Sequence, residues 1–256
     1  MTAGRHIEIT ALPGIPIVQP GCNLIELLSS ALSRAELTPQ DGDVLVVAQK
    51  VVSKAENRLV DLHTVDPSPE AERLASELDK DPRLVEVILS QTARVVRAER
   101  GVLIVEHRLG LIMANAGVDQ SNVDSEEGRW ALLLPADPDR SAEELQAAFA
   151  KHYGAKVAVI INDSFGRPWR LGVVGVAIGA AGLPSLIDKR GEKDLFGRPL
   201  EVTTIAFVDE IAAAASLIMG QADEGLPVVL IRGLTWSAPA SCARSLLRPR
   251  AEDLFQ

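Results

Sequence analysis

Aromatic residues are scarce in this chain of 256 residues, where 5 Phe, 3 Trp and 1 Tyr make up 4% of the sequence. A large core must therefore be built from Val, Leu, Ile and Ala, which suits buried strands and closely packed helices. The chain is 47% hydrophobic and 24% charged, which is typical of a globular protein. Its length predicts a single domain with a sizeable core and room for two lobes.

Cysteine and long apolar runs are also lacking. Cys22 and Cys242 lie far apart and have no zinc-ligand spacing, so we expect two small buried side chains and no disulfide framework. The N-terminal sequence MTAGRHIEIT has no apolar signal core, and no apolar run reaches the ~18 residues of a membrane-spanning helix. These absences predict a cytoplasmic protein without a membrane partner.

Positive charge is not in excess, because the formal net charge is −9 at pH 7. Such a chain has no basic field for a nucleic acid backbone, so we exclude nucleic acid as a partner and expect phosphate recognition to be local. The P-loop motif GxxxxGK[ST] is absent. Gly172, Gly175, Gly179 and Gly182 do not form GxGxxG after a strand, and close packing explains them better than nucleotide binding.

Helical and strand-like patterns fill most of the chain. Strands are predicted at 6–11, 43–48, 93–98, 102–106, 111–114, 157–161, 202–207 and 227–231. Helices are predicted at 23–37, 67–78, 82–91, 141–152 and 209–219, with N-caps at Asn23, Ser68, Asp81 and Ser141. Glu26 and Glu144 occupy capping-box positions, 135–140 is typical of a linker, and the three strands between 93 and 114 indicate a meander.

Polar chemistry is concentrated in residues 156–170, KVAVIINDSFGRPWR. The apolar run 157–161 predicts a strand buried on both faces, which delivers Asn162, Asp163 and Ser164 to the loop that follows it. Such a loop next to a rigid strand is a common place for a functional site. We interpret it as half of a divalent-metal site.

Two arginines close this stretch, Arg167 and Arg170. A planar guanidinium can hold a carboxylate or a phosphate through two hydrogen bonds. Both arginines are therefore our own candidates for binding acidic substrates.

The metal hypothesis uses oxygen donors from separate loops, namely Asp119, Asp163, Ser164 and Gln221. Such donors suit Mg²⁺ or Mn²⁺, which take carboxylates together with water and phosphate oxygens. The alternative stays open at this point, since Asp and Asn in loops are often turn formers or caps and surface lysines are usually solvated. The four histidines have no metal-ligand spacing and receive no role.

A set of unusual strings resembles one known family. In order along the chain they are ALPGIP, VVAQKVVSKAE, ANAGVDQSNV, LLPADPD, NDSFGRPWR, AIGAAG and KDLFGRPL. Together they are similar to the coenzyme F420-0:L-glutamate ligase (F420 gamma-glutamyl ligase) family over about residues 7–233. The resemblance implies an α+β fold with mixed and antiparallel sheets and packed helices, no P-loop, and a homodimer.

The resemblance also implies an activity. Members are GTP-dependent ligases that add L-glutamate to the lactyl carboxylate of the deazaflavin precursor F420-0 through an acyl phosphate, releasing GDP and phosphate. Further γ-linked glutamates follow. Two divalent ions, Mg²⁺ or Mn²⁺, are expected, with K⁺ as a further candidate.

Site residues are carried over from the same resemblance. The metal ligands are expected to be Asp119, Asp163, Ser164 and Gln221, and the catalytic residues Asp119, Asp163 and Lys54. The GTP-binding residues are expected to be Leu12, Pro13, Gly14, Ile15, Gln49, Lys50, Lys54, Asn122, Met219, Gly220, Gln221, Ala222, Asp223, Glu224, Gly225 and Leu226.

The chain departs from the family pattern at 171–175, LGVVG, where a more polar stretch is expected, which leaves substrate contacts there open. Because it ends at Gln256, we expect one ligase domain over 1–256 and no C-terminal flavin-binding domain. A metal-dependent phosphohydrolase and a non-catalytic nucleotide sensor or scaffold remain alternatives. The residues do not select GTP over ATP, nor the number of glutamates added.

Overall fold

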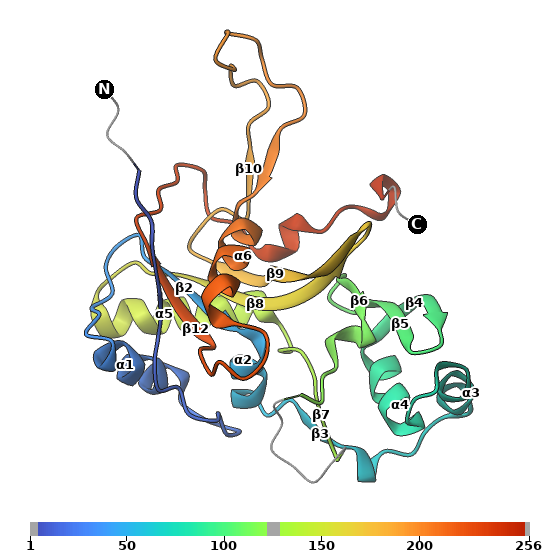
Figure 1. The fold of residues 1–256 in the computed structure, drawn as a ribbon. Helices are drawn as coiled ribbons and strands as arrows, with labels where there is room; N and C mark the ends of the chain where they lie inside the picture. Colours follow the sequence, from blue (N-terminus) through green and yellow to red (C-terminus); the bar gives the residue numbers. More distant parts are fainter. Residues whose placement is uncertain (1–4, 122–128, 254–256) are drawn as a thin grey trace.

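A five-stranded sheet forms the centre of the molecule, which a computed structural model describes over residues 5–121 and 129–253 (Figure 1). Its strand order is β1 (Glu8–Ala11), β12 (Val228–Arg232), β2 (Val44–Ala48), β8 (Ala158–Arg167) and β9 (Arg170–Ala181). β2 and β8 are parallel, and the other neighbours are antiparallel. The predicted α+β fold with mixed sheets is therefore confirmed.

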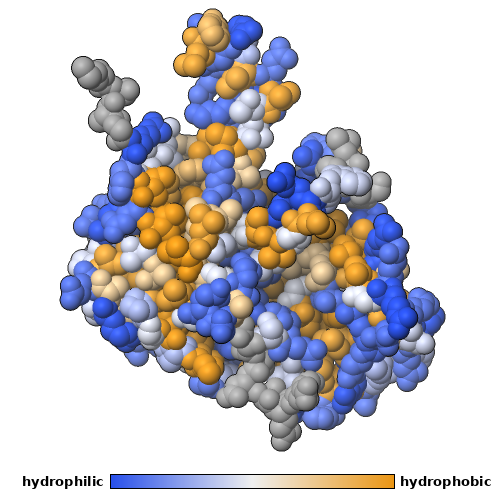
Figure 2. Space-filling view, in the orientation of Figure 1, coloured by the Kyte–Doolittle hydropathy of each residue, from blue (hydrophilic) through white to orange (hydrophobic). Residues whose placement is uncertain are grey.

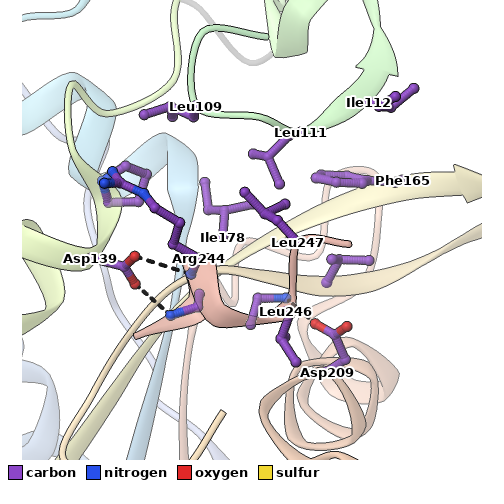
Figure 3. Close-up of a pocket in the computed structure, with 14 residues that line it drawn as sticks. Leu109, Leu111, Ile112, Asp139, Phe165, Ile178, Asp209, Arg244, Leu246 and Leu247 are labelled. Carbon is purple, nitrogen blue, oxygen red and sulfur yellow. Dashed lines mark hydrogen bonds between the residues drawn. The ribbon is translucent and has the colours of Figure 1, made fainter. Parts of the chain in front are cut away.

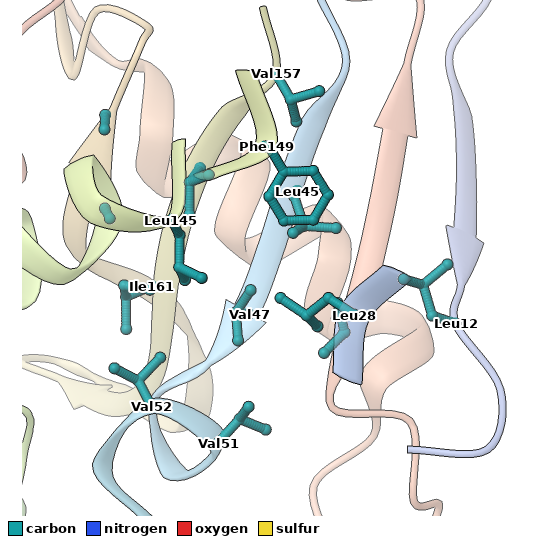
Figure 4. Close-up of a cluster of buried hydrophobic side chains, with 14 of the residues drawn as sticks. Leu12, Leu28, Leu45, Val47, Val51, Val52, Leu145, Phe149, Val157 and Ile161 are labelled. Atoms are coloured by element: carbon teal, nitrogen blue, oxygen red, sulfur yellow. The ribbon is translucent and has the colours of Figure 1, made fainter. Parts of the chain in front are cut away.

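Helices cover both faces of this sheet. α1 (Leu24–Arg34), α2 (Gln49–Ala55) and α5 (Pro138–Tyr153) contribute to the core on one face, and α6 (Phe207–Met219) packs on the other. Side chains alternate along β2, so Leu45 and Val47 enter the first core (Figure 4) while Val44 and Val46 enter the second. The prediction that 157–161 is buried on both faces is confirmed in the same way.

A third core lies around α3 (Pro69–Leu78), α4 (Pro82–Gln91) and the strands β4 (Thr92–Glu99) and β5 (Val102–His107), and β6 (Ile112–Ala114) pairs with β5. The strand order β4-β5-β6 confirms the predicted meander. The Ser68 and Asp81 side chains accept hydrogen bonds from the first turns of α3 and α4, as predicted. We call this part the meander lobe, and the division of the chain into lobes stays a prediction.

Shorter elements connect these parts. β3 (Leu59–Asp61) pairs with β7 (Trp130–Leu132), and the 3₁₀ turns are η1 (Leu62–Thr64), η2 (Asn115–Gly117), η3 (Ala243–Leu246) and η4 (Arg250–Glu252). β10 (Leu186–Asp188) and β11 (Thr204–Ala206) form the base of an arm that projects from the sheet (Figure 1). Among the described residues, no helix is both long and apolar enough to cross a membrane.

Two predicted helix starts are wrong. α5 begins at Pro138 rather than Ser141, because Asp137 provides the N-cap by accepting from the Arg140 N–H, and proline fits the first turn. The predicted linker is therefore partly helical, and Glu144 pairs with Arg140 instead of forming a capping box. Phe207 begins α6 rather than ending a strand. Its ring packs beside Trp236, a tertiary contact that sequence periodicity does not reveal.

Three smaller predictions also need correction. Asn23 occupies the N-cap position, but its side chain donates to Glu26 Oε1 (2.8 Å) and makes no backbone cap. The helix predicted to reach residue 37 ends at Arg34, and Glu36 has a positive φ of 55°. Cys22 is half-buried and Cys242 is exposed, so neither is the fully buried side chain expected.

Candidate functional site

A cleft of about 1660 Å³ lies beside the carboxyl ends of β2 and β8. Its wall includes residues from α2, the loop after α6, the meander lobe and the C-terminal segment. Because β2 and β8 are parallel neighbours, the residues that follow each strand meet at one edge of the sheet. Polar groups from distant parts of the sequence are thereby brought into one space.

Lys50 and Asp119 form the polar contact at the base of the cleft. Lys50 Nζ lies 2.7 Å from Asp119 Oδ2 and donates to Ser121 Oγ at 2.7 Å. The Asp119 carboxylate also accepts from the Ser121 N–H (2.7 Å) and hydroxyl (3.0 Å). Burial acts to raise the pKa of Asp119, but the hydrogen bonds from Lys50 and Ser121 outweigh it and hold the pKa below its usual value.

Asp163 is the second carboxylate in the cleft, and it lies on β8. Its Oδ1 accepts from the Ser164 N–H at 2.8 Å. Burial, together with repulsion from Asp119, raises the pKa of Asp163 to about 6. The hydrogen bond from the Ser164 N–H and the positive charge of Lys50 offset only part of this increase, and the proximity of two carboxylates favours an additional cation.

The prediction that Asn162, Asp163 and Ser164 lie on a loop is wrong. β8 continues to Arg167 because β9 supplies a pairing partner along its whole length, with a register shift between Ile161 and Asn162.

Gly175 of β9 allows helix α6 to pack closely against this strand pair. A Cβ atom there would lie 2.4 Å from the Ala212 carbonyl oxygen, so glycine lets α6 approach the strand, and packing is confirmed as its role.

Most of the expected ligand residues line the cleft. They are Ile15, Gln49, Lys50, Lys54, Asp119, Asp163, Ser164, Arg167 and all of residues 219–226. Gln49, Lys50 and Lys54 belong to the short helix α2, which begins directly after β2 ends at Ala48. The structure thus brings together residues from five separate segments of the sequence.

A few expected residues lie elsewhere. The Leu12 side chain is fully buried in the core, and Pro13 and Gly14 are not among the described residues that line the cleft. Asn122 lies outside the described residues. Arg170 is exposed and does not line the cleft, whereas Arg167 does, and its Nη1 is buried without a hydrogen-bond partner among the described residues.

The oxygen donors fit a hard divalent cation. Asp119, Asp163, Ser164 and Gln221 all line the cleft and offer oxygen ligands, and the described residues that line the cleft include no His or Cys. Within residues 5–121 and 129–253, no group of three or more His, Cys, Asp and Glu side chains is placed to hold a metal by itself. An ion here would complete its coordination with water or phosphate oxygens, as Mg²⁺ and Mn²⁺ do.

Several residues of the cleft escaped the sequence-based site prediction. Asn162 is 6% exposed, its amide donates to Ser216 Oγ and Met219 Sδ, and its Oδ1 has no partner among the described residues. The sequence placed Asn162 beside Asp163 in the same polar stretch but gave it no ligand role. Arg97 and the segment 246–253 also line the cleft, and no motif marks either of them.

Comparison with known proteins connects the cleft to a family. The sequence matches the family F420-0:Gamma-glutamyl ligase over residues 14–233. A coenzyme F420:L-glutamate ligase from Methanothermobacter thermautotrophicus is 46% identical over 252 residues, covering 98% of this chain and 99% of the relative. Proteins of the same name from Methanopyrus kandleri and Methanocaldococcus jannaschii are 48% and 42% identical, each over 98% of both chains. The matched region contains most of the residues that line the cleft.

Proposed function

Since the chain belongs to the F420-0:Gamma-glutamyl ligase family, we propose that it adds L-glutamate to coenzyme F420-0 using GTP and divalent metal ions. The product carries an amide on the lactyl carboxylate of F420-0, and further γ-linked glutamates are added in the same way. The enzyme would act in coenzyme F420 biosynthesis. One observation carries the proposal: Lys50, Asp119, Asp163 and Gln221, far apart in sequence, line the same cleft.

The reaction requires activation because a carboxylate is a poor electrophile. A lactyl carboxylate oxygen attacks the γ-phosphorus of GTP, and GDP leaves. The glutamate amine then attacks the carbonyl carbon of the acyl phosphate, loses a proton, and releases inorganic phosphate. Both steps depend on charge neutralisation and alignment more than on covalent participation of the protein.

The residues of the cleft suit these demands. Asp119 and Asp163 would hold two divalent ions, with Ser164 and Gln221 as neutral oxygen ligands. When bound, the Mg²⁺ or Mn²⁺ ions would neutralise phosphate charge and orient the triphosphate, and K⁺ is a further candidate. Lys50 already lies 2.7 Å from Asp119, so its ammonium group is held where phosphate oxygens would approach the carboxylates.

The nucleotide and the acidic substrates would occupy different walls. Gln49, Lys50, Lys54 and residues 219–226 form a continuous group around the ends of β2 and α6, where we place GTP. Arg167 lies on the β8 wall, and its Nη1 has no hydrogen-bond partner within the described part of the chain, so it is our candidate for binding a substrate carboxylate or phosphate. Arg170 remains a candidate only if a substrate or a second protomer reaches beyond the cleft.

A homodimer is the assembly we propose. The arm above β10 and β11 carries apolar side chains in the open (Figure 2), with Leu195 100%, Phe196 83% and Val202 84% exposed. Exposed apolar side chains gathered on one projection are typical of an interaction surface. Sedimentation velocity would test the assembly, and a monomer across the working concentration range would reject it.

Product analysis tests the activity. Purified protein incubated with F420-0, L-glutamate, GTP and Mn²⁺ should give mass increments of one or more glutamates, together with GDP and phosphate. Omitting any one component should abolish the product. Phosphate release from GTP without glutamate and F420-0 would instead indicate a phosphohydrolase, and the absence of metal-dependent GTP binding in calorimetry would indicate a scaffold.

A matched pair of variants tests the site. Asp163→Asn should abolish glutamate addition while the protein stays folded. Asp209→Asn is the control, because Asp209 is also a partly buried carboxylate with a pKa raised by burial and also accepts a backbone hydrogen bond, from Ala177, but lies outside the cleft. Near-normal activity of Asp163→Asn would mean that Asp163 is not a metal ligand.

A further inference from the structure

The segment 243–253, which we call the C-terminal wall, forms a side of the cleft for which the sequence suggests no role. Leu246, Leu247, Arg248, Arg250 and Asp253 all line the cleft. They lie beyond residue 233, where the family match ends. Figure 1 shows this segment running alongside β9 toward the meander lobe.

One carboxylate anchors the start of the C-terminal wall. Asp139, in the first turn of α5, accepts from the Ala180 N–H (2.9 Å) and the Ala243 N–H (2.7 Å) through Oδ1. Its Oδ2 accepts from the Arg244 N–H at 3.2 Å (Figure 3). Three backbone donors on one carboxylate tie the wall to both β9 and α5, so its start has a defined position.

Apolar packing fixes the next part of the wall. Leu246 and Leu247 line a small cavity of about 220 Å³ together with Leu111 and Phe165 (Figure 3). Gly110, with φ +87°, approaches so closely that a Cβ atom would lie 2.8 Å from Leu247 Cδ1. The wall therefore packs against both the central sheet and the loop of the meander lobe.

Two arginines follow the packed leucines and reach the cleft. Arg248 is exposed and Arg250 begins the turn η4, and both line the cleft. Arg97 and Arg167 line it from other elements. Two ion pairs lie in this part of the cleft, Glu106 with Arg94 at 3.1 Å and Arg97 with Glu99 at 2.6 Å. Asp253 of the C-terminal wall also lines the cleft. Arg248 and Arg250 thus add two guanidinium groups to the wall formed by the C-terminal segment, which contains neither Asp119 nor Asp163.

The size of the cleft leaves room for a second ligand. Its volume of about 1660 Å³ exceeds the ~300–1,000 Å³ of most small-molecule pockets. The residues assigned to GTP and metal ions account for the walls at α2, β8 and 219–226. The C-terminal wall and the meander lobe bound the remaining space.

We propose that Arg248, supported by Arg250, binds an anionic group of the precursor, so that the C-terminal wall is part of the acceptor-substrate site. This proposal rests on the proposed function, because it takes F420-0 as the substrate. Guanidinium groups bind acidic groups such as those of F420-0. Asp139 and Leu247 hold the C-terminal wall in place, so the wall presents its arginines in a fixed position.

Steady-state kinetics on the full-length protein tests this proposal. Arg248→Ala should raise KM for F420-0 by about tenfold, the order expected for one charge-assisted hydrogen bond, with KM for GTP changed less than about twofold. Arg248→Glu should raise KM for F420-0 further, and Arg248→Lys should raise it less than Arg248→Ala does, because the effect depends on the charge at position 248. The double variant Arg248→Ala/Arg250→Ala should have a higher KM for F420-0 than either single variant.

Arg244→Ala is the matched control, since Arg244 is an exposed arginine of the same segment that does not line the cleft. It should leave KM for F420-0 unchanged. Equal effects of Arg244→Ala and Arg248→Ala, no dependence on charge at 248, or a rise in KM for glutamate or GTP instead of F420-0 would each overturn the proposal. Failure of the proposed function is distinguishable, because wild-type protein would then form no glutamate adduct at all.

Discussion

His107 makes the stability of the protein depend on pH. It ends β5, is 4% exposed, and accepts from the Leu109 N–H through Nδ1 at 2.9 Å. Its Nε2 is buried without a partner among the described residues. Burial, reinforced by the positive charges of Arg58 and Arg108, lowers the pKa of His107 from 6.5 to about 4.

The sign follows from proton binding. Between about pH 6.5 and about pH 4 the unfolded imidazole holds a proton and the folded one does not, so acid favours unfolding. The contribution of neutral His107 is complete above the unfolded pKa and is lost as pH falls. Linkage gives a loss of about 2 kcal/mol between about pH 7.5 and about pH 5, and about 3 kcal/mol once both states are protonated.

Urea unfolding of the wild type and His107→Asn at those two pH values measures this loss. Asparagine does not titrate in this range, and its Oδ1 can accept the hydrogen bond from the Leu109 N–H. The variant should still be less stable than the wild type at about pH 7.5, because the smaller side chain loses packing contacts. The carboxylates titrate alike in both proteins, and the gap between them should shrink by about 2 kcal/mol at about pH 5.

His6→Asn provides the control, because His6 is an exposed histidine. It should leave the difference between the two pH values unchanged. If the free energies of unfolding of the wild type and His107→Asn fall in parallel with pH, His107 is not held neutral by the fold and the reasoning fails.

Three further predictions concern the cleft. Lys50→Met removes the ammonium group 2.7 Å from Asp119 and should raise KM for GTP by about tenfold or more, measured at fixed F420-0 and glutamate. Arg167→Ala should raise KM for an acidic substrate by about tenfold, and more than Arg170→Ala, because only Arg167 lines the cleft; equal effects would point to a structural role. Asp139→Ala leaves three backbone N–H groups without their acceptor, so limited proteolysis should cut near 243–253 faster and the free energy of unfolding should fall by roughly 1–3 kcal/mol.

Local sequence patterns were sufficient to predict the elements that are defined by residues close together in the sequence. The apolar run 157–161 predicted its strand because every residue in it is buried, and Ser68 and Asp81 predicted helix starts because each caps its own first turn. The core of Val, Leu, Ile and Ala followed from the scarcity of aromatic residues, and Phe149 is its one aromatic side chain among the largest fully buried ones.

Tertiary contacts decided the elements that were predicted wrongly. Asn162, Asp163 and Ser164 are polar and end an apolar run, which is typical of a loop, yet they remain in β8 because β9 pairs with them. Likewise, the Phe207 ring packs with Trp236, a residue 29 positions away in the printed sequence. Trp236 cannot be identified as a partner from residues near Phe207 in sequence, and the same holds for the C-terminal wall, whose anchor is Asp139.

The two carboxylates of the candidate metal site come from different cores, and this explains why spacing could not place them together. Asp163 extends from the central sheet, whereas the backbone of Asp119 pairs with that of Leu132. The neighbours of Leu132, Ala131 and Leu133, belong to the third core, in the meander lobe. Leu134 and Met113 belong to the other core. Gly117, with φ +66°, lies where a Cβ atom would be 2.8 Å from Leu134 Cγ and 2.9 Å from Met113 Cε. Apolar packing at this junction, two residues before Asp119, therefore helps to position Asp119 relative to Asp163.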